Sequence, residues 1–304
     1  MDSVLECLPR GSRIAILRLR SLGDCVLTTP ALDILKHFRP DLRLAIFVEN
    51  RFREVFEDNP DLAEIHTPEL AALRRFRPQL CLNFHGGTRS AWMTELSGAR
   101  YRAGFGHYRQ QFVYNVRIPR AQEILHVDRK VHTAEHLASA VFFLGAPVCE
   151  IPRAKLFSGG AASPARSPRS AIIHAIAAAP EKTWAPANFL AVADYLKHSG
   201  MDPVFIGGPD DDLTAFRLYP TLQSSLSEVK SLLAAAALFV GNDSGPAHMA
   251  AAFGLPSVVV FGPSDPAIWG PWRTPGEVVA APTGIADVSV AQVLSALQRL
   301  RVPA

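Results

Sequence analysis

Short apolar runs alternate with helically spaced segments along the whole chain. The apolar runs lie at 13–19, 43–48, 63–66, 79–84, 101–104, 171–177, 204–207, 235–240 and 257–261. Helical spacing marks 25–38, 52–56, 130–144, 187–198, 227–237, 246–253 and 289–300. Apolar runs without polar alternation are typical of strands buried on both faces of a parallel sheet. The alternation of strands and helices therefore predicts an α/β fold of parallel sheets covered on both faces.

The alternation is interrupted once, by a segment with almost no apolar bulk. Residues 158–169 (SGGAASPARSPR) are rich in Gly, Ser, Ala and Pro, which is typical of a linker. We therefore predict an N-terminal Rossmann-like domain over 1–157, a linker over 158–169 and a C-terminal Rossmann-like domain over 170–304. Two similar halves joined this way leave a central cleft, to which each presents the carboxyl ends of its strands.

Length and composition exclude several classes of protein. The 304 residues suffice for two domains of ordinary size. No stretch of about 18 uninterrupted apolar residues occurs, so no membrane span is predicted. The N-terminus lacks the basic and then apolar layout of a signal peptide. The four cysteines (Cys7, Cys25, Cys81 and Cys149) form no CxxC pair. This argues against a disulfide framework or a thiolate metal site, and the simplest compartment is a reducing cytoplasm.

Charge is distributed unevenly between the halves. Residues 1–155 carry 22 Lys and Arg against 17 Asp and Glu, whereas residues 156–304 carry 9 against 11. Arginine dominates the first half, and its planar fork suits phosphate and carboxylate groups, although a solvated surface is the simpler explanation. Basic runs with interleaved aromatic residues are absent, so a nucleic acid partner is not expected.

The most informative stretch is 239–272. The turn Gly241–Gly245 follows a buried strand, and Pro246 stands where first-turn prolines belong in the next helix. A strand, a glycine-bearing turn and a helix whose free N–H groups face that turn form an anion site. A second polar turn, 262–272, ends the next strand on the same edge, where ligands of open parallel sheets bind.

Three side chains bring chemistry to this turn. Asp243 supplies an acceptor, Ser244 a hydroxyl and His248 a titratable ring. The plain alternative is an ordinary helix start capped by Ser or Asp. The second polar turn on the same edge favours the ligand site.

Two further positions carry candidate chemistry. Asp24 ends the turn after the first strand, where it is either a helix N-cap or a general base that takes a proton from an acceptor hydroxyl. Lys182, in the loop PEKTWAP, faces the same edge as the 243–245 turn and can neutralise a phosphate, unless it is a solvated loop lysine. Trp184 is expected to pack under the following helix.

Other motif matches give weaker evidence for a function. His132–His136 fits H-x-x-E-H, but no third metal ligand is evident and an ordinary apolar helix follows, so no metal site is predicted. Ser227–Lys230 fits S-x-x-K without its companion motifs. Neither a Walker loop nor G-x-G-x-x-G occurs, so neither P-loop ATP hydrolysis nor dinucleotide binding is supported.

Three segments together resemble glycosyltransferase family 9, the heptosyltransferases of lipopolysaccharide core assembly. These are ILRLRSLGDCVLTTPALDILKHF at 16–38, KTW at 182–184 and, most specifically, NDSGPAHMAAAFGLP at 242–256 continuing to WGP at 269–271, within 241–271. Residues 83–105 also resemble the family. The segments occur in the family's order over almost the whole chain.

The resemblance implies the GT-B architecture, two Rossmann-like domains with the donor nucleotide on the C-terminal one and the acceptor on the N-terminal one. It implies inverting transfer of L-glycero-D-manno-heptose from an ADP-linked donor to an anionic, lipid-anchored core acceptor, with Asp24 as general base. Lys182 and the Asp243-Ser244-Gly245-Pro246 turn with His248 would hold the diphosphate, without a metal or other cofactor. The enzyme would be cytoplasmic, with a peripheral contact at the inner membrane.

Further residues are assigned by position. Asp210 follows a glycine pair at a strand end, where a ribose contact fits, and Asp210–Asp212 is not a metal-chelating D-x-D site. The turns after the first and fourth strands face the acceptor with Ser21, Gly23, His85 and Gly86.

One segment departs from the family pattern. Residues 174–179 (HAIAAA) replace a turn rich in glycine and hydroxyl groups, which removes backbone freedom and donors near the donor phosphates. Two other hypotheses therefore stay open. One is a transferase using another nucleotide-sugar or a protein acceptor, and the other is an inactive sugar-nucleotide binder.

Overall fold

The computed structural model describes residues 3–158 and 169–300 and divides the chain into two compact units, Met1–Pro152 and Arg153–Ala304. The first unit thus ends at Pro152, earlier than the predicted 157. Apart from its two end residues, the predicted linker lies outside the described residues.

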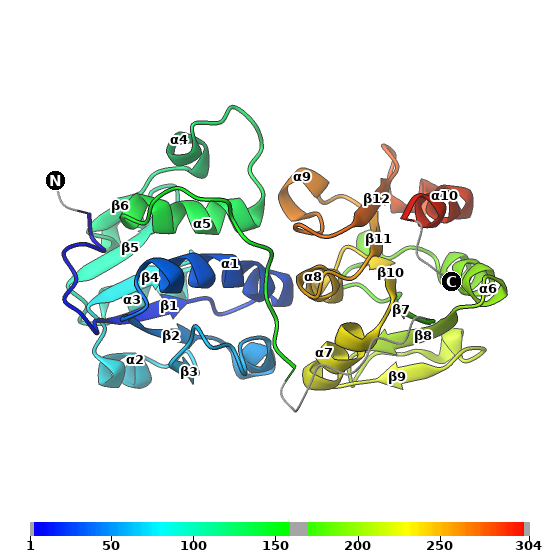
Figure 1. Cartoon of the computed structure of the whole chain (residues 1–304), viewed down its shortest axis with the longest axis horizontal. Helices are drawn as coiled ribbons and strands as arrows, with labels where there is room; N and C mark the ends of the chain where they lie inside the picture. The colour runs from blue at the N-terminus through cyan, green and yellow to red at the C-terminus, as the bar shows by residue number, and fades with distance from the viewer. Residues whose placement is uncertain (1–2, 159–168, 301–304) are drawn as a thin grey trace. The chain divides into compact units, whose positions relative to one another are not determined.

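The first unit contains one six-stranded parallel sheet in the order β3-β2-β1-β4-β5-β6. Its strands are β1 Arg13–Leu17, β2 Arg43–Phe47, β3 Glu64–His66, β4 Leu80–Asn83, β5 Tyr101–Phe105 and β6 Val116–Ile118. Its helices are α1 Leu22–Phe38, α2 Leu70–Phe76, α3 Thr88–Glu95, α4 Ala121–Leu125 and α5 Thr133–Leu144, with 3-10 turns η1 Asn50–Val55 and η2 Gln111–Val113. Helices α1 and α5 pack side by side on one face, and α2 and α3 cover the other (Figure 1).

The second unit repeats this plan with the strand order β12-β11-β10-β7-β8-β9. Its strands are β7 Ser170–His174, β8 Asp202–Gly207, β9 Thr221–Gln223, β10 Leu238–Asn242, β11 Ser257–Phe261 and β12 Gly276–Ala280. Its helices are α6 Pro186–His198, α7 Leu226–Ala235, α8 Gly245–Ala252, α9 Pro266–Trp269 and α10 Val290–Leu300, with 3-10 turns η3 Pro180–Lys182, η4 Thr214–Phe216 and η5 Ile285–Asp287. The prediction of an α/β fold with two parallel sheets is confirmed.

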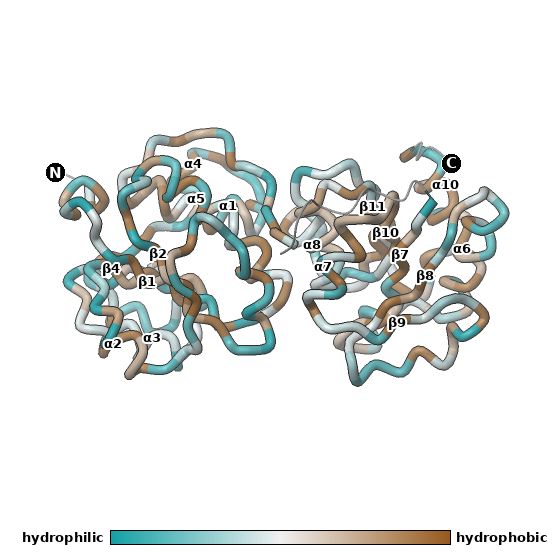
Figure 2. The backbone as a smooth tube through the Cα atoms, turned by 60° about the horizontal axis from the view of Figure 1, so that its bottom comes forward, coloured by the Kyte–Doolittle hydropathy of each residue, from teal (hydrophilic) through white to brown (hydrophobic). Residues whose placement is uncertain are grey.

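The cores explain why the central strands read as uninterrupted apolar runs. Strands β1, β2, β10 and β11 are buried almost throughout, and the tube of Figure 2 is brown along them. In the second unit Trp184 lies fully buried, stacks edge-on against Phe189 and donates its indole N–H to the Val288 carbonyl. This confirms the expected packing of Trp184 under helix α6.

The elements missing from the prediction are mostly short or at sheet edges. Strand β9 is exposed at all three residues and β12 is buried only at Val279, so neither shows an apolar run. Edge strands bury fewer side chains, and the pattern that identifies central strands is therefore weak there.

Candidate functional site

The strand order of each sheet reverses at one point, and both predicted sites lie there. In the second unit the reversal falls between β7 and β10, and in the first unit between β1 and β4. Connections leave toward opposite sides at such a point, which opens a crevice at the carboxyl ends of the two strands. The turn at 243–245 follows β10, and the turn containing Asp24 follows β1.

Asn242 organises the crevice of the second unit. It ends β10 and is completely buried, and its side-chain amide bonds both ends of the connection between β7 and α6. Nδ2 donates to the Ala175 carbonyl at 2.9 Å, and Oδ1 accepts the backbone N–H of Trp184 at 3.0 Å. One side chain thus fixes both ends of this connection, which carries Lys182, against the end of β10.

Replacement of this amide has a predicted cost. Asn242→Ala leaves a buried N–H and a buried carbonyl without their partner, and we expect it to lower the free energy of unfolding of this unit by about 2–4 kcal/mol. Urea unfolding followed by tryptophan fluorescence measures this. The control is Asn188→Ala on α6, expected to cost less than about 1 kcal/mol. Equal losses in the two variants would contradict the role given to Asn242.

Lys182 and Asp243 form an ion pair at the same edge. Lys182 Nζ lies 3.0 Å from Asp243 Oδ2, and the carboxylate is nearly buried whereas a third of the lysine side chain is exposed. The lysine loop is held by Ala179, whose carbonyl accepts the N–H of Lys182 and the hydroxyl of Thr183. Asp243 therefore orients an ammonium group that still reaches solvent.

Ser244 is the N-cap residue of α8, and Pro246 occupies the first turn as predicted. The Ser244 hydroxyl lies 3.1 Å from Nδ1 of His174, which ends β7. His248 is buried on α8. The hydroxyl, the first turn of α8 and the Lys182 ammonium together form a set of groups suited to an anion.

Burial also sets the ionisation of His174. It lowers the pKa of this ring to about 4, and Asp211 opposes the shift only in part. The folded unit therefore holds His174 neutral at pH 7. A neutral ring can accept the Ser244 proton or donate to its oxygen without adding charge to the site.

The depressed pKa of His174 predicts an acid-sensitive stability. The unfolded chain takes up a proton near pH 6.5 and the folded one near pH 4, so stability is complete above about 6.5 and declines as the pH falls toward 4. When the pH is lowered from 7 to 5, the free energy of unfolding should fall by about 2 kcal/mol less in His174→Gln than in the unmodified chain. Urea unfolding at the two pH values tests this, with exposed His198→Gln as a control that keeps the original slope.

The second polar turn packs against the lysine loop, as the sequence predicts. A Cβ at Gly262 would lie 2.4 Å from the Glu181 carbonyl oxygen, so only glycine permits this approach. Asp265 in the same turn accepts the Ala267 N–H as the N-cap of α9. The turns after β10 and β11 and the Lys182 loop therefore lie together at one edge.

Asp211, not the predicted Asp210, stabilises the turn after β8. Asp210 is exposed, whereas Asp211 accepts the Gly208 N–H at 2.7 Å and closes the turn. The ribose contact of Asp210 stays a prediction.

Asp24 occupies a different helix position from the one expected. Ser21 is the N-cap of α1 and Asp24 is the third helical residue, so the N-cap interpretation of Asp24 is wrong. Its Oδ2 accepts the Ser21 hydroxyl at 3.0 Å, and its Oδ1 lies 3.4 Å from the Arg18 guanidinium. The helix begins three residues before the expected Cys25 because this turn caps it.

The turn after β4 lies beside Asp24. Buried Asn83 accepts the N–H groups of His85 and Gly86 and donates to the Tyr114 hydroxyl. Gly86 has φ +73°, and a Cβ there would overlap the Tyr108 ring at 2.6 Å. The structure thus brings Ser21, Asp24, His85 and Gly86 to one crevice, with Gly23 in the first turn of α1.

Two buried nitrogen atoms on the residues around Asp24 have no hydrogen-bond partner among the described residues. They are Nε of Arg18 and Nδ1 of His85. Burial lowers the pKa of His85, and the positive charges of Arg18 and Arg20 lower it further. Unpaired buried polar atoms are uncommon, and they occur at strained or catalytic positions.

The H-x-x-E-H match has a structural explanation. His132 is the N-cap of α5 and accepts the Ala134 N–H through Nδ1, while Glu135 accepts the His132 N–H and pairs with Arg129. His136 stacks on Phe105 with ring centroids 3.9 Å apart. Within residues 3–158 and 169–300, no group of three His, Cys, Asp or Glu residues is placed to hold a metal ion.

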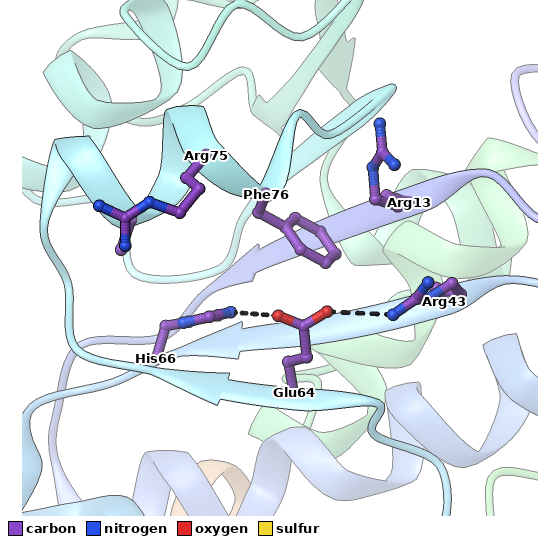
Figure 3. A pocket seen from close by; sticks show the side chains of 7 residues that line it. Arg13, Arg43, Glu64, His66, Arg75 and Phe76 are labelled. Carbon is purple, nitrogen blue, oxygen red and sulfur yellow. Dashed lines mark hydrogen bonds and ion pairs between the residues drawn. The ribbon is translucent and has the colours of Figure 1, made fainter.

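A basic pocket lies elsewhere in the first unit, between β1, β2 and β3 and helix α2 (Figure 3). This cavity of about 200 Å³ is lined by Arg13, Arg43, Glu64, His66, Ala72, Arg75 and Phe76. Arg13 and Arg43 begin their strands whereas His66 ends β3, and none of the lining residues belongs to the crevice around Asp24. Glu64 pairs with both Arg43 and His66. The pocket is therefore separate from the crevice at the carboxyl ends.

The site residues absent from the prediction share one signal. Arg18, Asn83, His174 and Asn242 are buried polar residues at or just past the end of an apolar strand next to a switch point. A polar residue that closes a buried strand indicates such a role, but only the strand order tells which of these strands flank the switch point.

Two parallel-sheet domains, each with a polar crevice at its switch point, match the GT-B fold of solved sugar transferases. The glycosyl transferase family 9 structure from Veillonella parvula superposes with a TM-score of 0.83 at 21% identity, covering 95% of this chain and 97% of that one. The E. coli heptosyltransferase WaaC with ADP gives a TM-score of 0.76 at 18% identity, covering 95% and 99%. At these identities the likeness concerns the fold alone.

The chain belongs to glycosyltransferase family 9 (heptosyltransferase), whose family model matches residues 70–292. The chain is also 25% identical over 293 residues to lipopolysaccharide heptosyltransferase 3 of Escherichia coli, with 84% of each chain covered. The resemblance inferred from the sequence is thereby confirmed. None of the helices in the described part of the chain is both long and apolar enough to span a membrane.

Proposed function

We propose that this protein transfers L-glycero-D-manno-heptose from its ADP-linked form to a lipopolysaccharide core acceptor of the lipid A–Kdo type, at the cytoplasmic face of the inner membrane. Family membership and the related lipopolysaccharide heptosyltransferase 3 support the reaction class. The observation that carries the donor assignment is the Lys182–Asp243 pair beside Ser244 and the first turn of α8.

In the proposed reaction the acceptor hydroxyl loses its proton to Asp24, and its oxygen forms a bond to the anomeric carbon of the donor. The bond from that carbon to the diphosphate oxygen breaks, and the electron pair leaves with ADP. Attack from the face opposite the leaving group inverts the anomeric centre. Each sugar transferred thus yields one ADP and one proton.

The chemical demand at the donor is the negative charge that grows on the diphosphate. Lys182 supplies a positive charge, and the N–H groups of α8 supply a positive helix end. Asp243 holds the Lys182 ammonium and Asn242 holds the loop that carries it, so little reorganisation of the lysine is needed when charge develops. In this proposal the step needs no metal.

The proposal is tested by incubating the full chain with ADP-heptose and a series of core acceptors truncated one sugar at a time. Mass spectrometry should detect the addition of one heptose to one acceptor of the series, with release of ADP. UDP- and GDP-sugars should give no product, and EDTA should leave the rate unchanged. Absence of transfer to every acceptor, despite ADP-heptose binding, would contradict the proposal.

A second function is favoured by the loop 177–179. Its three alanines lie at the edge of the donor crevice, half-buried or exposed, and have no side-chain donors for phosphate. A chain that binds sugar nucleotides without turning them over, or that uses another nucleotide-sugar, would tolerate this change. Calorimetry with ADP-, UDP- and GDP-sugars distinguishes these alternatives from the heptosyltransferase.

A further inference from the structure

The first unit exposes an aromatic patch that its fold does not use. Trp92 and Leu96 stand one helical turn apart on α3 and just after it, and Phe112 lies on η2. Their exposed fractions are 48%, 43% and 64%. The rings of Trp92 and Phe112 meet edge to face with centroids 6.3 Å apart. We call Trp92, Leu96 and Phe112 the aromatic patch.

Arginine side chains border the aromatic patch. Arg74 Nε donates to the Leu96 carbonyl at 2.9 Å, and Arg102 Nε donates to the Val113 carbonyl, next to Phe112, at 3.1 Å. Arg109, in the loop before Phe112, is exposed. A hydrogen bond from Gln110 to Thr88 ties that loop to the start of α3. The apolar surface and the cationic groups are therefore parts of one connected surface.

The net positive charge of the first half lies in the stretch of sequence that carries the aromatic patch. Residues 84–120 contain six arginines and one glutamate, with no lysine or aspartate. The remainder of residues 1–155 is balanced, with 16 basic and 16 acidic residues. The one glutamate, Glu95, pairs with Arg102 at 3.2 Å. The whole positive excess of the first half thus belongs to the segment that carries Trp92, Leu96 and Phe112.

From this combination we infer that the aromatic patch docks on the surface of an anionic phospholipid bilayer. Trp and Phe rings enter the interfacial region while arginines remain at the level of the headgroup phosphates. A second copy of the chain is a poor occupant because two surfaces of the same positive charge repel each other. The biological meaning of the docking rests on the proposed function, whose acceptor is held in a bilayer, but the binding itself can be measured without transfer.

The test uses the full chain and vesicles of phosphatidylcholine alone or with phosphatidylglycerol, in a sedimentation assay. The chain should bind the anionic vesicles, and binding should weaken as salt rises. Trp92→Ser with Phe112→Ser should lower the partition coefficient at least about 10-fold. Arg74→Gln with Arg109→Gln should lower it less and flatten the salt dependence. Exposed Phe143→Ser on α5 and Leu218→Ser in the second unit should stay within about twofold of the unmodified chain.

Several outcomes would overturn the inference. They are equal binding to neutral and anionic vesicles, unchanged binding of the Trp92/Phe112 variant, or a concentration-dependent dimer in sedimentation analysis that this variant abolishes. Thermal unfolding of each variant confirms that it is folded. Transfer without vesicle binding would refute the docking alone, whereas vesicle binding without transfer to any acceptor would refute the proposed function alone.

Discussion

Asp24→Asn is expected to lower kcat for heptose transfer by about 10²–10⁴-fold, the range that general base catalysis contributes. The amide keeps the shape of the side chain and can still accept the Ser21 hydroxyl, but it cannot take a proton from the acceptor. The KM for the donor should change little, because the proposed donor groups belong to the other unit. Steady-state kinetics with both substrates varied separates the two parameters.

Glu135→Gln is the matched control for this prediction. Glu135 is also the third residue of its helix, accepts the backbone N–H of the N-cap residue and pairs with an arginine, Arg129. It therefore shares the capping role of Asp24 but has no proposed part in transfer. If the two variants lose activity equally, or if neither does, the assignment of Asp24 as the base is wrong.

Lys182→Met should weaken ADP binding by about 10–100-fold, the loss expected when one charged hydrogen bond to a diphosphate is removed. The fall in kcat should be of the order of 10²–10³, as for loss of one preorganised group that stabilises developing charge. Methionine keeps an unbranched side chain of similar length and lacks the ammonium group, with its charge and its N–H donors. Calorimetry with ADP and initial-rate kinetics measure the two effects.

The ion pair sharpens this prediction. In Lys182→Met the nearly buried Asp243 carboxylate loses its partner and faces the diphosphate, so the variant suffers repulsion as well as a lost contact. The double variant Lys182→Met with Asp243→Asn should therefore bind ADP more tightly than Lys182→Met alone. Lys197→Met on the exposed face of α6 should bind normally. ADP affinity that stays unchanged in Lys182→Met would refute the phosphate role.

The sequence predicted the central part of each sheet well because burial on both faces leaves a direct mark. Strand β11 begins and ends where the apolar run at 257–261 does, and β1 and β2 differ from their predictions only at the carboxyl end. The edge strands β9 and β12 have exposed side chains and therefore no such mark. The start of α1 was placed too late because the capping turn that begins it is polar.

The candidate site divides in the same way. Local spacing identified the turn at 243–245, the proline in the first turn of α8 and the lysine loop. Helix starts and glycine turns depend on residues that are close together in the sequence. The contact between Lys182 and Asp243 joins residues 61 positions apart, and the pair of His174 with Ser244 joins residues 70 apart. Such pairs follow from strand order, which no local pattern encodes.

The sequence by itself determined the α/β class, the family and the turns that carry candidate chemistry, since each depends on periodicity or on short motifs. The tertiary structure decided which turns share a crevice, because strand order places β10 beside β7 and β1 beside β4. It also decided that Lys182 meets Asp243, and that burial keeps His174 neutral. Residues that are distant in the sequence and are brought together by folding set both properties, so no local sequence pattern predicts them.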